Sequence, residues 1–285
     1  MKNIQLIECP RDAMQGWSHF IPTEKKINYI NTLLKVGFDT LDFGSFVSPK
    51  AIPQMADTKE VLKHLDLSST KTKLLAIIAN VRGAEDAVEF DAINYLGFPF
   101  SISPTFQQRN TNSSMEESIE RVDAIQELCV KHNKTLVVYL SMGFGNPYGD
   151  EYNDAILLKW ADEMVKRNVE IISLADTVGL ATKEQISYAL NTLIPQYPYV
   201  NIGVHLHSSA SDRKEKLEAA INAGCYRIDG ALKGFGGCPM AQNDLVGNMD
   251  SEWLLQYLAL NNIPHGNINQ EELLKALMMT NEIFI

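Results

Sequence analysis

The stretch "NSSMEESIERVDAIQELCVKHN" (112–133) is followed almost at once by "TLVVYLSM" (135–142), and together they show how this chain is built. In the first part, Ser114 stands three residues before Glu117, which is the pattern of a capped helix N-terminus. Apolar residues then recur at helical spacing, at Ile119, Val122, Ile125 and Cys129. The second part is apolar at most positions, as in a strand buried on both faces. The two parts predict a helix that leads into a buried parallel strand.

The same alternation recurs along the chain. Eight short apolar runs lie at residues 4–9, 40–46, 73–80, 92–101, 135–142, 171–177, 201–208 and 226–232. Helical patterns follow them at residues 24–36, 57–65, 83–90, 115–132, 153–168, 182–194, 211–223 and 251–261. Eight strand–helix units predict a closed (β/α)₈ TIM barrel. An open, doubly wound sheet is the alternative, but "CPRDAMQG" (9–16) lacks the GxGxxG turn of that fold.

Composition limits the class of protein. The 285 residues are 45% hydrophobic, and we expect one barrel domain over 1–285, with one more helix at about 268–285. A net charge of −10 argues against binding to nucleic acid or to anionic membranes. The four cysteines form no CxxC pair, no apolar run is long enough to span a membrane, and residues 1–12 show neither the long apolar stretch of a signal peptide nor an Arg/Ser-rich transit segment. We therefore expect a reduced, cytoplasmic protein.

Polar residues gather where the predicted strands end, which is where TIM barrels carry their chemistry. They are Glu8, Arg11 and Asp12 (strand 1), Asp42 and Ser45 (strand 2), Asn80 (strand 3), Ser141 (strand 5), Ser173, Asp176 and Thr177 (strand 6), His205 and His207 (strand 7), and Cys238, Asn248 and Glu252 after strand 8. Carboxylates, imidazoles, an amide, an arginine and a thiol are thus predicted to meet at one mouth.

The pair His205 and His207 points to a metal. Residues two apart on a strand face the same side, so both imidazoles face one spot, and Leu206 faces the helices. With one carboxylate they make three ligands, which suits Mg²⁺ or Mn²⁺, with Zn²⁺ as a further candidate.

Each residue also has a structural alternative. A buried histidine can be a core residue, and Arg11–Asp12 can be a surface ion pair. Asp176 can cap a helix, Cys238 can be a small apolar residue, and Asn248 can belong to a turn. The shared location of all these residues favours a site.

At these residues the chain resembles the hydroxymethylglutaryl-CoA lyase family, TIM-barrel metallolyases with an Arg-Asp motif. The matching stretches are "ECPRDAMQ" (8–15), "SFVSPKAIPQMADT" (45–58), "NTNSSMEESIERVDAI" (110–125), "SLADTVGLAT" (173–182), "HLH" (205–207) and "GFGGCPMAQ" (234–242). "SFVSPK" and "GGCP" are the parts that distinguish these lyases from the isopropylmalate and homocitrate synthases, which share the Arg-Asp and HxH elements.

The resemblance implies a role for each matching residue. The metal ligands would be Asp12, His205, His207 and Asn248. Arg11 would polarise the thioester carbonyl, Cys238 would take part in proton transfer, and Glu252 would be the family's glutamate four residues after the asparagine. We also expect Ser45, Ser173, Asp176 and Thr177 to contact the substrate.

The chain departs from the family pattern beside these residues. Asp42 stands where the family usually has glutamate, "RDAMQ" replaces "RDGLQ", and residues 208–211 read Ser-Ser-Ala-Ser in place of Asp-Thr-Tyr-Gly. The spacing from Cys238 to Asn248 is one residue longer than we expect for the family. These differences leave the exact acyl-CoA open.

The implied reaction is retro-Claisen cleavage of 3-hydroxy-3-methylglutaryl-CoA to acetyl-CoA and acetoacetate, a step of leucine degradation and ketone-body formation. The sequence leaves Asp42, Glu252, His205 and Cys238 all open as general base or acid. One alternative is a related lyase or condensing synthase for another 3-hydroxyacyl-CoA or a 2-oxo acid. A non-catalytic barrel is the other. We expect an acyl-CoA substrate and a homodimer or larger homo-oligomer.

Overall fold

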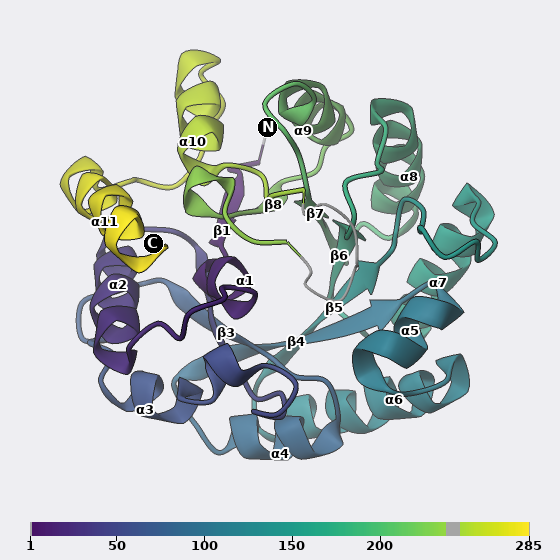
Figure 1. Ribbon diagram of the computed structural model, residues 1–285. Helices are drawn as coiled ribbons and strands as arrows, with labels where there is room; N and C mark the ends of the chain where they lie inside the picture. Colours follow the sequence, from purple (N-terminus) through teal and green to yellow (C-terminus); the bar gives the residue numbers. More distant parts are fainter. Residues whose placement is uncertain (1, 238–245, 285) are drawn as a thin grey trace.

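A closed barrel of eight parallel strands forms the centre of the computed structural model, which describes residues 2–237 and 246–284 (Figure 1). The strands lie in chain order, and β8 closes the ring by pairing with β1. The predicted TIM barrel is therefore confirmed. Each predicted apolar run contains one strand. The strands are β1 (Gln5–Glu8), β2 (Thr40–Ser45), β3 (Lys73–Ile77), β4 (Ile93–Ser101), β5 (Thr135–Ser141), β6 (Ile171–Asp176), β7 (Asn201–Leu206) and β8 (Arg227–Gly230).

Helices surround the barrel on the outside (Figure 1). Those that the sequence predicts are α2 (Thr23–Val36), α3 (Thr58–Lys63), α4 (Val81–Val88), α6 (Met115–Lys131), α7 (Asp154–Lys166), α8 (Lys183–Gln196), α9 (Arg213–Asn222), α10 (Ser251–Leu260) and the C-terminal α11 (Gln270–Ile283). Four short elements were not predicted: α1 (Pro10–Gln15), α5 (Pro104–Thr111), and the 3₁₀ turns η1 (Pro53–Met55) and η2 (Leu232–Gly234). Ser114 and Glu117 form the capping box expected at the start of α6.

Two hydrophobic layers follow from the alternation of side chains along the strands. A small cluster inside the barrel contains Leu75, Val137 and Tyr139. The larger layer lies between the strands and the helices, and it includes Leu206, as the HxH pattern predicts. Within the described residues, no helix is both long and apolar enough to cross a membrane.

The predicted strand ends are one to three residues too late in several places, and the largest difference is at strand 3. The third strand ends at Ile77, and Asn80 lies beyond it. Its side-chain oxygen accepts a hydrogen bond from the backbone N–H of Gly83 at 2.9 Å, so Asn80 is the N-cap of α4.

Candidate metal and active site

Arg11 and Asp12 lie in the first turn of α1, directly after β1. Pro10 occupies the first helical position, where its fixed φ is favourable and its missing N–H costs nothing. The helix therefore begins at the C-terminal mouth of the barrel, and both side chains are buried there.

The guanidinium of Arg11 is held on two sides. Its Nε lies 3.0 Å from Asp42 Oδ2, and its Nη2 lies 2.5 Å from the same oxygen. Its Nη1 donates to Asp12 Oδ1 at 3.2 Å and to Gln15 Oε1 at 2.8 Å. Arginine carries five N–H donors, and these contacts use four. Among the residues that the structure describes, none accepts from the second Nη2 N–H, which can bind a further acceptor.

His205 and His207 meet Asp12 at the same mouth. One candidate ligand atom from each of the three residues lies within 4.8 Å of the others. The imidazole centroids of the two histidines are 5.3 Å apart. Two residues that are nearly 200 positions from Asp12 in sequence therefore come together with it, as the HxH hypothesis requires.

Asn248 reaches this cluster from the segment after η2. It forms an isolated antiparallel bridge with His207, and its Nδ2 donates to Asp12 Oδ2 at 2.7 Å and to the carbonyl of Phe235 at 2.8 Å. Gly236 makes the approach possible. Its φ is +106°, and a Cβ there would lie 2.5 Å from Asn248 Nδ2.

These four residues fit a divalent cation. The Oδ1 of Asn248 is buried and has no hydrogen-bond partner among the described residues, although a buried amide oxygen normally has one. A cation beside Asp12, His205 and His207 would satisfy it. The donor set combines two imidazoles, a carboxylate and an amide oxygen, which suits Mg²⁺ or Mn²⁺ and also admits Zn²⁺.

The protonation states of Asp12 and His207 also favour a cation. At His205, burial lowers the pKa, but Asp229 and Asp12 outweigh this effect and raise it. Burial raises the pKa of Asp12, but Arg11 and the two histidines outweigh this effect and lower the pKa to about 2. Burial and the neighbouring His205 lower the pKa of His207 to about 3, so its imidazole is neutral. A carboxylate and a neutral imidazole are the forms that bind metals.

Asp42 differs from Asp12. Burial raises its pKa to about 6, and the charge and hydrogen bonds of Arg11 only partly offset that rise. Asp42 therefore titrates closer to neutral pH than an ordinary aspartate does.

A cavity of about 130 Å³ opens beside the cluster, and Arg11, Asp12, His205 and His207 all line it. Pockets for drug-sized ligands usually measure roughly 300–1,000 Å³. This cavity therefore has room for a small acyl group, not for a whole nucleotide-bearing molecule.

The four expected substrate contacts divide into two pairs. Ser45 and Thr177 line the cavity. Ser173 and Asp176 are buried outside its lining, and Asp176 accepts hydrogen bonds from Lys216 Nζ at 2.9 Å and from the backbone N–H of Ala181 at 2.9 Å.

Two other candidates, Asp42 and Glu252, lie outside the cavity lining. Asp42 sits behind Arg11 and is not part of the cavity lining. Glu252 is half-buried in the first turn of α10, outside that lining, and its Oε1 accepts a hydrogen bond from Gln256 at 3.4 Å. Cys238 lies outside the described residues.

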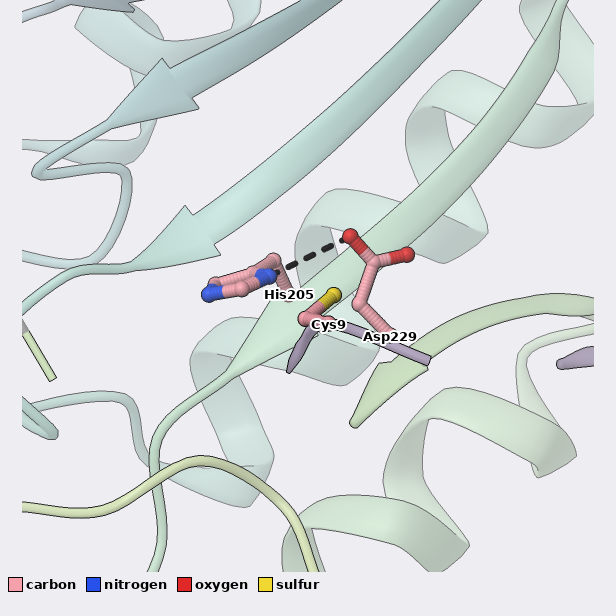
Figure 2. A group of neighbouring side chains, drawn as sticks. All are labelled: Cys9, His205 and Asp229. Atoms are coloured by element: carbon pink, nitrogen blue, oxygen red, sulfur yellow. Dashed lines mark hydrogen bonds and ion pairs between the residues drawn. The ribbon is translucent and has the colours of Figure 1, made fainter. Parts of the chain in front are cut away.

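The sequence reasoning missed three polar residues of the site. Gln15 bonds both Arg11 and Asp12, and the ring of Tyr139 meets His205 edge-on at 5.8 Å. Asp229 Oδ2 lies 3.2 Å from His205 Nδ1 (Figure 2). Strand alternation is the signal that could have found two of them, since Tyr139 and Asp229 face the inside of the barrel.

Comparisons with known proteins agree on one family. A sequence model of the family described as HMGL-like matches residues 3–279. Hydroxymethylglutaryl-CoA lyase YngG of Bacillus subtilis (strain 168) is 32% identical over 267 residues, which cover 94% of this chain and 88% of the relative. The human mitochondrial hydroxymethylglutaryl-CoA lyase is 31% identical over 276 residues, covering 96% of this chain and 84% of the relative.

A solved structure shows the same likeness in three dimensions. It is an HMG-CoA lyase of Acinetobacter baumannii in complex with coenzyme A and 3-methylmalate. It matches with a TM-score of 0.91 and 28% sequence identity, over 99% of this chain and 91% of that one.

Proposed function

Since the chain belongs to the HMGL-like family and is a carbon–carbon lyase, we propose that it cleaves 3-hydroxy-3-methylglutaryl-CoA to acetyl-CoA and acetoacetate with a divalent metal. The observation that carries the proposal is the meeting of Arg11 with three metal-type donors at one small cavity. In a retro-Claisen cleavage, negative charge develops on two oxygens, the C3 alkoxide and the thioester enolate. The site offers a separate positive group for each of them.

Asp12, His205, His207 and the Oδ1 of Asn248 would hold the metal, which is Mg²⁺ or Mn²⁺ in this proposal. When bound, the metal would supply Lewis-acid stabilisation of the C3 alkoxide. Arg11 would stabilise the enolate oxygen with the one Nη2 N–H that no described residue occupies. Asp42 and Gln15 hold its guanidinium in place before substrate arrives, so little reorganisation is needed during the reaction.

Proton transfer needs a base for the C3 hydroxyl and an acid for the enolate carbon. Burial raises the pKa of Asp42 to about 6, but Asp42 lies behind Arg11 and outside the cavity lining, so it would hold Arg11 and not contact the C3 hydroxyl. His205, which lines the cavity, stays open as the base. Cys238 and Glu252 remain the candidates for the acid on the grounds of the family resemblance.

The cavity supports an acyl-CoA substrate. Its volume of about 130 Å³ accommodates the acyl group, and Ser45 and Thr177 would contact that group there. The coenzyme A portion would extend out of the mouth. The coenzyme A complex of the Acinetobacter relative supports this class of substrate.

The direct test is acetoacetate release by the purified chain. We expect hydroxymethylglutaryl-CoA to turn over with Mg²⁺ or Mn²⁺, and we expect EDTA to stop the reaction and added metal to restore it. A panel of other 3-hydroxyacyl-CoA thioesters, and of 2-oxo acids with acetyl-CoA, should run alongside. Faster turnover of another panel member would replace the proposed substrate. No turnover of any member with metal present would contradict the metal-dependent cleavage.

We further propose a cytoplasmic location, a homodimer or larger homo-oligomer, and a place for this reaction in leucine degradation and ketone-body formation. Light scattering coupled to size exclusion tests the oligomer. A monomer at the concentration of the assay would contradict it.

A further inference from the structure

A buried carboxylate beneath the metal donors has no part in the proposed reaction. Asp229 lies on β8, with its side chain inside the barrel and fully shielded from solvent. Its Oδ2 is 3.2 Å from His205 Nδ1, whereas its Oδ1 has no hydrogen-bond partner among the described residues. Burial of an ionisable side chain with one oxygen unpaired is costly, so its retention calls for a reason.

The reason lies in the two nitrogens of His205. Figure 2 shows Nδ1 directed at Asp229 and the other ring nitrogen turned away from both Asp229 and Cys9. A neutral imidazole carries one proton, and only the nitrogen without it can bind a metal. A proton on Nδ1, donated to Asp229, leaves Nε2 as the ligand atom toward Asp12 and His207.

His207 is supported differently, because its ring bonds a backbone group of Thr177. Across residues 2–237 and 246–284, no carboxylate lies within salt-bridge distance of its ring, whereas its backbone carbonyl accepts from Lys216 Nζ at 2.8 Å. The two histidines of the HxH motif are therefore held in different ways. A carboxylate bonds the ring of His205, whereas a backbone group of Thr177 bonds the ring of His207 and Lys216 holds the backbone of His207.

We infer that Asp229 is a positioning residue that holds His205 with its proton on Nδ1 and thereby sets the affinity of the site for its metal. This inference rests on the ligands named in the proposed function. Carboxylates that orient metal-bound histidines are typically worth about 10- to 100-fold in metal affinity.

Cys9 completes the group in Figure 2 but does not make it a second metal site. Candidate ligand atoms of Cys9, His205 and Asp229 also lie within 4.8 Å of one another. Burial raises the pKa of the Cys9 thiol well above its usual value, and the thiol form is a poor ligand. Within this group, the contact to His205 is therefore the one that Asp229 makes with its Nδ1.

The first experiment measures Mn²⁺ affinity by electron paramagnetic resonance at pH 7. Asp229→Asn should weaken binding by about 10- to 100-fold, because an amide can turn its NH₂ toward Nδ1 and favour the wrong tautomer. Glu8→Gln is the matched control. Glu8 is also a buried barrel carboxylate, but it bonds Leu232 and Ser251 in place of a ligand. The control should stay within about twofold of the wild type.

The second experiment starts from the wild type, so its first result does not depend on the folding of a variant. In ¹⁵N-histidine-labelled, metal-free protein, at a pH high enough for His205 to be neutral, long-range proton–nitrogen spectra should show the proton of His205 on Nδ1. The same spectra of folded Asp229→Asn should show a shift toward the Nε2-protonated form. A merely structural role for Asp229 would leave this tautomer unchanged.

The outcomes separate this inference from the proposed function. If the wild type binds no Mn²⁺, the proposed metal site fails. If the wild type binds Mn²⁺ and Asp229→Asn binds it as tightly, or if wild-type His205 carries its proton on Nε2, only the role of Asp229 is overturned.

Discussion

Replacing Lys216 with methionine tests how much the buried ammonium group between the ends of β6 and β7 contributes to the stability of the fold. Lys216 is 2% exposed, and its Nζ lies 2.9 Å from Asp176 Oδ2, 2.8 Å from the carbonyl of His207 and 3.1 Å from that of Gly179. The side chain thus joins the ends of β6 and β7. Methionine has a similar length but cannot make these bonds, so the substitution leaves the buried Asp176 carboxylate without its counter-ion.

The expected loss follows from the burial of the pair. Removal of one partner of a buried ion pair typically costs about 3–5 kcal/mol. A protein of 285 residues has an unfolding entropy of roughly 0.6 kcal/mol/K. The melting temperature of Lys216→Met should therefore fall by about 5–8 °C.

The assay is thermal unfolding followed by circular dichroism at pH 7.5. The control is Lys214→Met on the same helix, because the 2.7 Å pair of Lys214 with Glu218 is largely exposed. It should change the melting temperature by less than about 1 °C. Adding Asp176→Asn to Lys216→Met removes the buried, unpaired charge of Asp176. The double variant should regain at least half of the lost melting temperature. The reasoning would be refuted if the melting temperature of Lys216→Met fell by less than about 2 °C, or if the double variant were no more stable than the single one.

Three further predictions concern the site, and a fourth concerns the effect of the buried Glu8 on stability. His207→Ala should lose about one equivalent of bound metal in elemental analysis, while exposed His64→Ala keeps it; full retention by His207→Ala would contradict the ligand assignment. Arg11→Lys should be folded but nearly inactive, because an ammonium cannot reproduce the fork between Asp42 and Gln15, whereas exposed Arg82→Lys should be active. Iodoacetamide should label Cys238 before the three buried cysteines and abolish turnover, and activity after complete labelling would leave Cys238 without a catalytic role. Burial raises the pKa of Glu8 to about 8, against about 4.3 in the unfolded chain, so between these pH values the folded state binds one more proton than the unfolded state. The free energy of unfolding should therefore fall as the pH rises from 5 to 8. Glu8→Gln should make this fall smaller.

The barrel was predictable because its signals are local and repeated. Each apolar run contains its strand, and the capping box at Ser114 and Glu117 marks the start of α6 as written in the sequence. The short helices α1 and α5 were missed because no apolar periodicity marks their buried faces: α1 buries Arg11 and Asp12 beside Met14, and α5 buries Phe106 and Gln107. Both begin with proline, which signals a turn as readily as a first helical residue.

The site was predictable in its residue types but not in its contacts. The HxH spacing places both imidazoles on one face, and strand ends bring Arg11 and Asp12 to the same mouth. No rule of sequence spacing predicts that Arg11 donates hydrogen bonds to Asp42, or that Lys216 Nζ donates to the carbonyl of His207. Such contacts depend on the register between neighbouring strands, and a single sequence does not show that register.

The bond between Asn248 and Asp12 joins residues that are 236 positions apart. During synthesis, a ribosome makes Arg11 and Asp12 before the last part of the barrel, so their partners do not yet exist when they emerge. A nascent or truncated chain that stops before residue 248 would hold at most three of the four proposed donors. Since a ligand stabilises only the form that binds it, the proposed metal would favour chains that include residue 248 over shorter fragments. Metal uptake would then also select for a closed barrel during biosynthesis.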